Sequence, residues 1–513
     1  MALLRSAATV GGYTMVSRVL GFVREMLVAA FLGASPISDA FFVALRLPNM
    51  FRSLFAEGAF SAAFVPLFAG KVAREGHEAA RRFAEDALAV LLTVLLIFLL
   101  LGEMLTPFIL DVIAPGFRAE PEKFRLAVEL TRIMFPYLLF ISLTALQGGV
   151  LNSLERFAAM AFTPVLLNLF LIAVLVSVRP LRGDDLAWAV AAAGFAQFLW
   201  LTFSCWQAGM PLSLPWPRLT PEVKRLLRIM LPGVFGAGVL QINLVVSTAM
   251  ASLLPTGAVS YLNYADRLNQ LPLAVLGIAV GTAILPPLSR QVRLGDDAGA
   301  ITTQNRGLEL ALLLTVPAAI GLAIAAQPIL AVLFQHGKFT AFDTAATAPA
   351  LGAYAAGLPA FVMVKVMAPG YFARQDTKTP VKIGAATMAV NVALTLGLGW
   401  LLAQTGIALA LSIAGWLNAL LLIAILNRRG HFAADRRLRR ALPRILLAGF
   451  GMGVLLLLLR WLLADALAAR FAVKLAALAG LVGGGLLGYA LLALLFGAAD
   501  LGELRRRFRR LAA

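Results

Sequence analysis

The chain has 513 residues, of which 61% are hydrophobic and 14% are charged, and its mean hydropathy is +0.87. Soluble domains contain about 45–50% apolar and about 25% charged residues, so this composition excludes an ordinary soluble protein and indicates a polytopic membrane protein. The net charge of +18 does not indicate nucleic-acid binding, because most Lys and Arg lie in short hydrophilic breaks between apolar runs, where they set topology.

The chain contains few cysteines and histidines, which limits the disulfides and metal sites that it can form. A single cysteine, Cys205, excludes an intramolecular disulfide, and His77, His336 and His431 are too far apart to form a metal-binding motif. Residues 1–32 are expected to be a retained first span rather than a signal peptide. Arg18 and Arg24 interrupt the place where an apolar core should run, and no clear cleavage site follows them.

An α-helical span requires about 20 apolar residues, and the strand-like alternation typical of a barrel is absent. On this basis the fold class is an all-α membrane protein with fourteen transmembrane helices. We expect the spans near residues 7–32, 37–69, 84–112, 125–151, 157–178, 185–208, 226–253, 258–288, 307–334, 343–372, 381–403, 407–426, 443–463 and 472–497.

Prolines and glycines mark three of these spans as bent or broken helices. The second span contains Pro48 and Gly58, the eighth contains Pro272 and Gly277, and the tenth contains Pro359. An even number of spans places both termini on the same side. When that side is taken as cytoplasmic, its loops hold most of the basic residues outside the spans, which predicts cytoplasmic termini.

An internal repeat is visible when the chain is shifted by 221 residues. Arg46-Leu47 then meets Arg267-Leu268, and a shift of 223 residues brings Asn168 onto Asn391. A shift of six spans predicts two six-helix lobes in the same orientation, related by a pseudo-twofold axis along the membrane normal, with a binding site between them. The expected domains are an N-terminal lobe (1–210), a C-terminal lobe (211–430) and a terminal helix pair with a basic tail (431–513).

Four arginines lie within otherwise apolar stretches, namely Arg18, Arg24, Arg52 and Arg267. A charge at bilayer depth costs several kcal/mol, so such residues usually face a cavity and act there. Arginine keeps its proton, and its planar fork matches a phosphate or carboxylate. The four therefore predict a site for a polyvalent anion inside the membrane. The alternative is that each one reaches an interface or pairs with a nearby acid.

Three acids accompany these arginines as candidates for gating or ion pairing. Asp39 follows the short loop 33–38, and it is equally well explained as a helix N-cap. Glu57 is a candidate to pair with a cavity arginine or to gate it, and Glu25 is a candidate to neutralise a neighbouring arginine. Arg46 and Lys365 are further basic candidates, but the sequence does not say whether they face the cavity.

No enzyme motif is present. The chain has no Walker loop, no His-Glu-x-x-His and no nucleophile elbow, and it contains few histidines and few intramembrane acids. We therefore expect a transporter rather than an enzyme, without a cofactor.

Five stretches resemble one known family. They are SRVLGFVRE at 17–25, SDAFFVALRLPNMFRSLFAEGAFSAAFVPLF at 38–68, YADRL at 264–268, LFQHGKFTAFDT at 333–344 and YFARQDTKTPVKIG at 371–384. Together they closely resemble the MurJ (MviN) family of bacterial lipid II flippases, in the multidrug/oligosaccharidyl-lipid/polysaccharide (MOP) exporter superfamily.

The resemblance implies fourteen helices in two lobes around a central cavity in the bacterial inner membrane. It implies alternating access that moves undecaprenyl-diphosphate-linked disaccharide-pentapeptide from the inner to the outer leaflet for peptidoglycan biosynthesis. The family's cavity arginines match at Arg18, Arg24, Arg52 and Arg267, and its essential aspartate matches at Asp39. Its lipid-tail groove would correspond to residues 443–463 and 472–497.

This chain also departs from the family pattern. Gln270 stands where some members carry an acid, which changes the charge near Arg267. Some members bind sodium through acids on the seventh and eleventh helices, whereas this chain offers Gln241, Asn243, Asn391 and Thr395 without a carboxylate. Asn243, Asn391 and Thr395 could form at most a weak cation site, and protons or membrane potential remain alternative drivers.

The chemistry of arginine fits the diphosphate substrate that the resemblance implies. Guanidinium groups form charge-assisted bidentate bonds to a diphosphate, whose desolvation would be prohibitive without them. Our hypothesis is that Arg24, Arg52 and Arg267 clamp the diphosphate, that Arg18 assists, and that Asp39 and Glu57 form state-dependent ion pairs.

Three other functions remain as alternatives. The nearest is a flippase for another polyprenyl-diphosphate oligosaccharide. A multidrug exporter would favour cavity acids, and a membrane glycosyltransferase would require a catalytic carboxylate near a large outer loop. The expected partners are lipid II and membrane lipids, with the cell-wall synthesis machinery as a further candidate and no nucleic acid. We expect a monomer.

Overall fold

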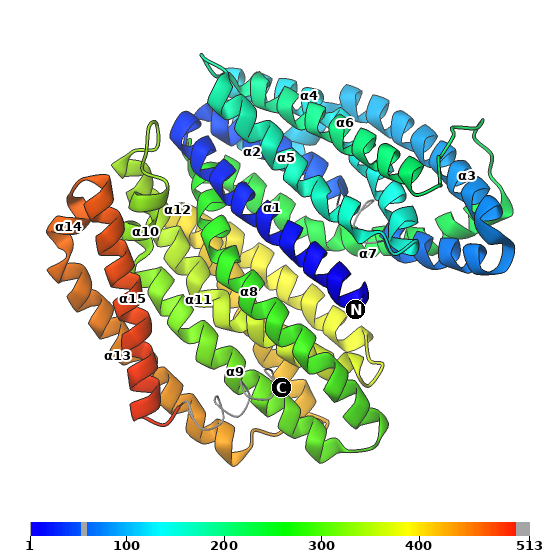
Figure 1. Cartoon of the computed structure of the whole chain (residues 1–513). Coiled ribbons are helices and arrows are strands. Elements are labelled where there is room, and N and C mark those ends of the chain that lie inside the picture. Colours follow the sequence, from blue (N-terminus) through cyan, green and yellow to red (C-terminus); the bar gives the residue numbers. More distant parts are fainter. Residues whose placement is uncertain (1, 53–58, 499–513) are drawn as a thin grey trace. The chain divides into compact units, whose positions relative to one another are not determined.

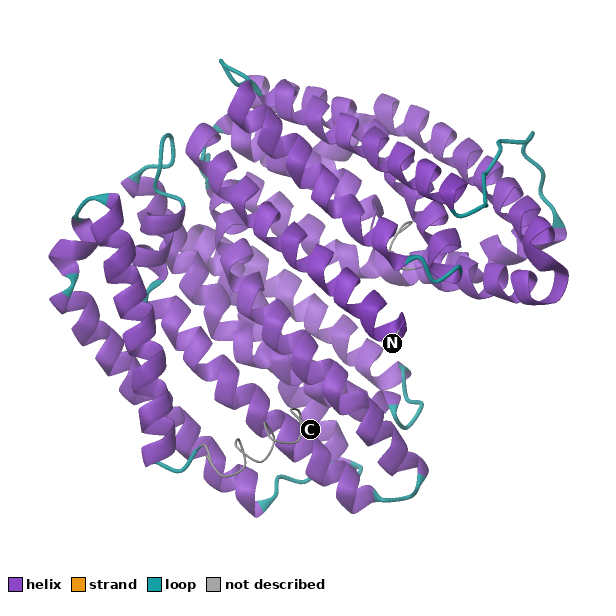
Figure 2. Cartoon of the chain, in the orientation of Figure 1, coloured by secondary structure: helices purple, strands orange, loops and turns teal. Residues whose placement is uncertain are grey.

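A computed structural model of the chain describes residues 2–52 and 59–498. The regular structure of this part is helical, and it contains no strand (Figure 2). In chain order (Figure 1) the elements are α1 (Ala2–Leu32), α2 (Pro36–Arg52), α3 (Ala59–Ile113), the 3₁₀ turn η2 (Pro115–Ala119), α4 (Pro121–Ser153), α5 (Phe157–Ser177), α6 (Gly183–Gln207), α7 (Pro221–Ser252), α8 (Ala258–Arg293), α9 (Asp297–Ile324), α10 (Ala326–Leu333), α11 (Ala341–Phe372), α12 (Lys378–Arg428), α13 (Arg436–Leu462), α14 (Ala464–Ala468) and α15 (Phe471–Leu495).

Within these described residues, nine helices are long and apolar enough to cross a membrane. Two of them, α3 with 55 residues and α12 with 51, each join two helices across a residue with non-helical backbone. The break in α3 is at Gly76 (φ 84°), where glycine tolerates the positive φ, and the break in α12 is at Ala403 (φ 50°). The expected all-helical, polytopic membrane class is confirmed.

The prolines singled out in the sequence do not end their helices. Helix α2 includes Pro48, α8 runs through Pro272, and α11 runs through Pro359. Each proline removes one intrahelical hydrogen bond, a loss that neighbouring helices can compensate inside a membrane. Gly58, the other expected breaking point of the second span, lies outside the described residues.

Several helix starts are explained by local sequence. Thr220 caps α7 by accepting from the Val223 amide, and Asp435 caps α13 by accepting from Leu438. Thr340 and Asp343 form a reciprocal capping box at the start of α11. These side chains satisfy amide groups that a helix leaves unpaired at its first turn.

The chain divides into two compact units, residues 1–260 and 261–513, with the boundary in the first turn of α8. In the first unit, α4 packs on α2, α3 and α6, while α1 packs on α5 and α7 packs on α3. Phe60, Phe64 and Phe68 stack in sequence along α3, and Phe83 stacks on Phe64. Such aromatic pairs contribute about 0.5–1.5 kcal/mol each beyond their buried area.

The second unit is built around α11, which packs on both α9 and α12. The contact between α11 and α12 is close, because a Cβ added to Gly357 would lie 2.5 Å from the Ser412 hydroxyl oxygen. Small residues allow helices to approach in this way inside membranes, where packing rather than water drives association. Helix α13 packs on α9 and α15. The contacts thus group α7 with the first unit, and the expected lobes 1–210 and 211–430 remain a prediction.

Candidate functional site

Arg24 is held in a fixed orientation within the first unit. Its guanidinium bonds to the Glu25 carboxylate at 2.5 Å and to Asn168 Oδ1 of α5 at 3.0 Å. The Arg24 side chain is 11% exposed and that of Glu25 is 4% exposed. Asn168 is itself fixed, since its amide nitrogen donates to the Ser17 carbonyl at 3.0 Å. Glu25 therefore pairs with Arg24, and Asn168 is a partner that the sequence did not reveal.

The other arginines of the first unit occupy different settings. Arg18 lies on an exposed part of α1. Arg52, at the end of α2, is half-buried, and its Nε donates to Asn49 Oδ1 at 3.4 Å. Arg46 donates to the Thr248 hydroxyl of α7, so this arginine binds a neighbouring helix of its own unit. Glu57 lies outside the described residues.

Asp39 is hydrogen-bonded through both of its carboxylate oxygens. Its Oδ1 accepts from the amide and the hydroxyl of Ser260, at 3.0 and 2.6 Å, and its Oδ2 accepts from the Gly257 amide at 2.8 Å. These amides belong to the start of α8. The carboxylate therefore caps α8 rather than its own helix, where it satisfies unpaired amide groups and meets the positive end of the helix dipole.

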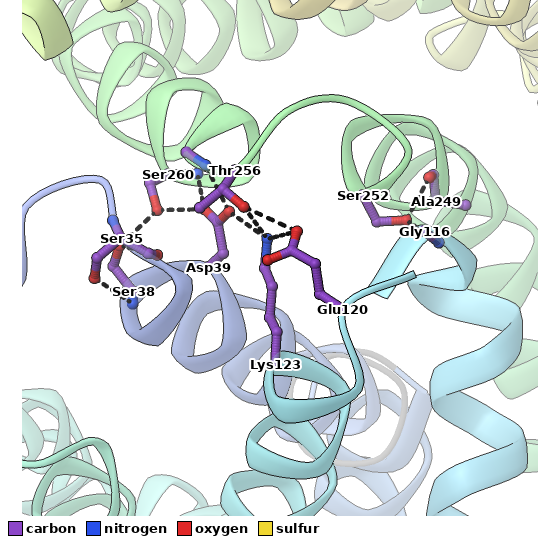
Figure 3. Close-up of polar contacts among 11 residues, drawn as sticks. Ser35, Ser38, Asp39, Gly116, Glu120, Lys123, Ala249, Ser252, Thr256 and Ser260 are labelled. Atoms are coloured by element: carbon purple, nitrogen blue, oxygen red, sulfur yellow. Dashed lines mark hydrogen bonds and ion pairs between the residues drawn. The ribbon is translucent and has the colours of Figure 1, made fainter. Parts of the chain in front are cut away.

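Lys123, at the start of α4, supplies the positive charge opposite Asp39. Its ammonium lies 3.1 Å from Asp39 Oδ2, and the two side chains are 3% and 1% exposed. The same ammonium donates to the Thr256 hydroxyl at 3.1 Å and lies 3.5 Å from Glu120 Oε1. Figure 3 shows these side chains converging from α2, α4 and the start of α8. We call Asp39, Glu120, Lys123, Thr256, Gly257 and Ser260 the Asp39 cluster.

A second contact lies beside the Asp39 cluster, also drawn in Figure 3. The Gly116 amide of η2 donates to the Ser252 hydroxyl at the end of α7, at 3.1 Å. A Cβ on Gly116 would lie 2.0 Å from the Ser252 carbonyl oxygen, so only glycine permits this approach. The Asp39 cluster and the Gly116–Ser252 contact thus bring together the starts of α2, α4 and α8 and the end of α7.

Beyond Asp39, little in the sequence indicates this cluster. Lys123 stands 84 positions from Asp39 and resembles the other loop lysines that set topology. One local feature points to a partner for Lys123, namely its position two residues after Pro121, where α4 begins. A cation at the start of a helix is disfavoured by the helix dipole, and a nearby acid offsets this effect.

In the second unit, Arg267 of α8 is half-buried, and the neighbouring Asp266 accepts from Gln270. Lys365 is an exposed residue of α11, and its side chain lies over Gly277 of α8, where an added Cβ would come within 3.0 Å of the ammonium nitrogen. The Lys365 side chain thus contacts α8. The roles of both basic residues remain predictions.

The candidate cation site is divided between the two units. Asn243 belongs to α7, whereas Asn391 and Thr395 are buried one helical turn apart on α12. Among the described residues there is no group of three or more His, Cys, Asp or Glu side chains that could hold a metal ion. A cation site at these three residues therefore remains a prediction.

The second unit contains a carboxylate that the sequence did not single out. Asp343 is 8% exposed, and its Oδ1 accepts from the Tyr261 hydroxyl of α8 at 2.9 Å. Its Oδ2 accepts from the amide and hydroxyl of Thr340 at 2.7 and 2.9 Å. This carboxylate therefore joins α8 to α11 by neutral donors.

Comparisons with known proteins show which sequences and structures the chain is similar to. The family model described as "Lipid II flippase MurJ" matches residues 28–478. The chain is 46% identical to "Probable lipid II flippase MurJ" of Rhizobium meliloti, covering 99% of this chain and 97% of that protein. It is 41% identical to "Lipid II flippase MurJ" of Burkholderia cenocepacia, covering 84% and 85%.

Two solved structures are also similar. One is titled "Lipid II flippase MurJ, inward closed conformation", with TM-score 0.78 and 25% identity, covering 95% of this chain and 98% of that one. An inward-facing multidrug resistance MATE family transporter of the MOP superfamily has TM-score 0.64 at 15% identity, covering 82% and 98%. The second likeness shows a shared fold alone.

Proposed function

The chain belongs to the MurJ family of lipid II flippases, and on that premise we propose that it carries lipid II from the inner to the outer leaflet by alternating access. It is a multi-pass membrane transporter rather than an enzyme, and it acts in peptidoglycan biosynthesis. The steps proposed here concern how its own residues bind the head group and close the two sides.

Arg24, Arg52 and Arg267 clamp the diphosphate of the substrate, and Arg18 assists them. The observation that carries this proposal is the fixed, nearly buried guanidinium of Arg24 between Glu25 and Asn168. A preoriented guanidinium loses little conformational entropy when it binds a phosphate in bidentate fashion. If a diphosphate replaces Glu25 as the partner of Arg24, the positive charge of Arg24 stays paired with a negative charge before and after the substrate binds.

Asp39 closes the outer side, and Glu57 is the second acid proposed to exchange ion-pair partners. The support for Asp39 is its set of bonds, since its carboxylate joins α2 to α4 and to the start of α8. The structure holds the bonded state, and alternating access would require a second state in which these contacts are separated.

We further propose fourteen spans in two six-helix lobes plus a terminal pair, with both termini cytoplasmic in the bacterial inner membrane. At about 1.5 Å per residue, α3 and α12 are each far longer than the roughly 30 Å hydrocarbon core. Their breaks at Gly76 and Ala403 therefore favour two spans from each. The excess of basic residues in alternate loops supports the orientation.

The first experiment is depletion of the protein in its host, followed by labelling of lipid II on the outer leaflet. Wild type should restore the label, while Arg24→Lys and Arg267→Lys should restore it poorly, because an ammonium cannot reproduce the bidentate fork. Arg125→Lys is the matched control, since the Arg125 side chain is 78% exposed and pairs with Glu122, whose side chain is 86% exposed.

Each outcome bears on a different part of the proposal. Unchanged outer-leaflet lipid II after depletion would contradict lipid II transport by this chain. Full restoration by both lysine variants would leave transport intact and remove the arginine clamp.

A further inference from the structure

Lys123 is the cation at the centre of the Asp39 cluster. Its side chain is 3% exposed, and its ammonium lies 3.1 Å from Asp39 Oδ2 and 4.4 Å from the centre of the Phe117 ring. Removing an ammonium from water is very unfavourable unless an opposite charge and hydrogen-bond acceptors replace the water. Asp39, Thr256 and Glu120 provide these replacements.

The partners of Lys123 come from separate elements of the first unit. Asp39 belongs to α2, Phe117 belongs to η2, and Thr256 belongs to the connection between α7 and α8. Separation of α2 from α4 would leave the Asp39 carboxylate without its counter-charge, and would leave Lys123 with Glu120, whose side chain is 48% exposed, as its one remaining acid in the cluster. Breaking a buried pair on one side is far more costly than breaking an exposed one.

The neutral donors alone would hold Asp39 differently. Gly257 and Ser260 bind the carboxylate through amide and hydroxyl groups, and neither contributes a full charge. Water can replace such donors when the helix ends separate, so they form a weak barrier to opening. The ion pair with Lys123 adds a direct attraction between two full charges, which these neutral donors lack.

We propose that Lys123 is a positioning residue of the outer gate, whose charge keeps the ends of α2, α4 and α8 together through Asp39. This inference rests on the proposed function, in which Asp39 closes the outer side. It adds that closure depends on a cation from α4, so that the gate opens when this ion pair separates.

The test uses full-length protein in cells, with Cys205→Ser and Ser38→Cys as the background. Ser38 is completely buried and its hydroxyl lies 2.9 Å from that of Ser260, so a thiol there reports separation of α2 from α8. A charged, membrane-impermeant thiol reagent is added from outside. Lys123→Met should raise the labelling rate on the order of tenfold by removing the charge at similar side-chain length.

Two variants separate charge from shape. Lys123→Arg keeps the cation and should label within about twofold of the background, because the ion pair can still form. Arg125→Gln, on the same helix, removes an exposed charge and should leave labelling unchanged. Folding of Lys123→Met is checked by its abundance in the membrane and its melting temperature.

The double variant Asp39→Asn/Lys123→Met completes the design. Because both changes break one interaction, its labelling should not exceed that of the faster single variant, whereas independent contributions would multiply. A multiplied rate would overturn the inference. It would also be overturned if Lys123→Met lost transport without faster labelling, or if Lys123→Arg labelled as fast as Lys123→Met.

The same assay separates this inference from the proposed function. If Asp39→Asn speeds labelling and stops transport while Lys123→Met does neither, the Asp39 gate stands and the role of Lys123 is wrong. If neither variant speeds labelling, the gate itself is wrong and the inference is overturned with it.

Discussion

The two units each hold a buried carboxylate near a helix start, Asp39 in the first and Asp343 in the second, and they satisfy it in different ways. Asp343 takes two of its hydrogen bonds from Thr340 in its own capping box and one from Tyr261 of α8. Asp39 takes its hydrogen bonds from the start of α8 and its counter-charge from α4.

This difference separates a carboxylate that stabilises one helix from a carboxylate that joins several. If α8 moved away from α11, Asp343 would keep its bonds to Thr340 and remain paired. If α2 moved away from α4 and α8, Asp39 would lose its partners together. A contact of the second kind is suited to a moving part, because its energy changes with the position of whole helices.

The internal repeat sharpens the comparison. The shift of 221 residues that overlays Arg46 on Arg267 also places Asp39 on Ser260. Ser260 is the residue whose amide and hydroxyl bind Asp39. One copy of the repeat thus supplies the carboxylate, and the equivalent position of the other copy supplies its donors.

The largest expected effect separates the two carboxylates directly. Asp39→Asn should destabilise the protein by about 3–5 kcal/mol and abolish flipping, because the buried Lys123 loses its buried counter-charge and keeps the half-exposed Glu120. Asp343→Asn should cost less than about 1 kcal/mol, since asparagine at this third position of the capping box can still accept from the Thr340 amide and leaves no buried cation unpaired. Thermal unfolding in detergent and outer-leaflet lipid II labelling measure both effects. Equal losses in the two variants would remove the distinction.

A smaller effect is expected when one hydroxyl donor is removed from each carboxylate. Ser260→Ala and Tyr261→Phe should each lower the free energy of unfolding by about 0.5–1.5 kcal/mol. Their effects on transport should differ, with slower flipping in Ser260→Ala and near wild-type flipping in Tyr261→Phe. The comparison would fail if Tyr261→Phe slowed flipping as much as Ser260→Ala.

The smallest effect concerns an exposed ion pair in the second unit, between α11 and α12. Hydrogen bonds from Thr379 and then from Arg429 hold the pKa of Asp376 well below its usual range. Because the folded pKa is depressed, its stabilisation is present above the unfolded pKa of about 3.9 and is lost as pH falls below it through the folded pKa.

Hydrogen exchange in residues 373–378, corrected for intrinsic rates, should therefore show the same protection at pH 7 and pH 5. Protection should fall modestly below about pH 4, because protonation weakens the bonds to Asp376. Asp376→Asn should remove this pH dependence while the Asp39 cluster is unaffected. An unchanged pH profile in Asp376→Asn would show that another group is responsible.

Much of the candidate site could be anticipated because charges in apolar sequence are rare. That rule selects Arg24 and Asp39, and the Glu25 carboxylate is paired with Arg24 in the structure. Local capping rules offered Asp39 as a cap for its own helix, whereas its carboxylate caps α8. Local sequence describes which group can cap, and packing decides which helix end it reaches.

Hydropathy and composition by themselves determined that this protein is a helical, polytopic membrane protein, because the lipid core requires long apolar helices whatever their packing. The motifs likewise determined its family. Only the tertiary structure decided that Asp39 meets Lys123, 84 residues away, and that Arg24 meets Asn168, 144 residues away. Each pairing depends on which helices pack together, and hydropathy does not specify which helices become neighbours.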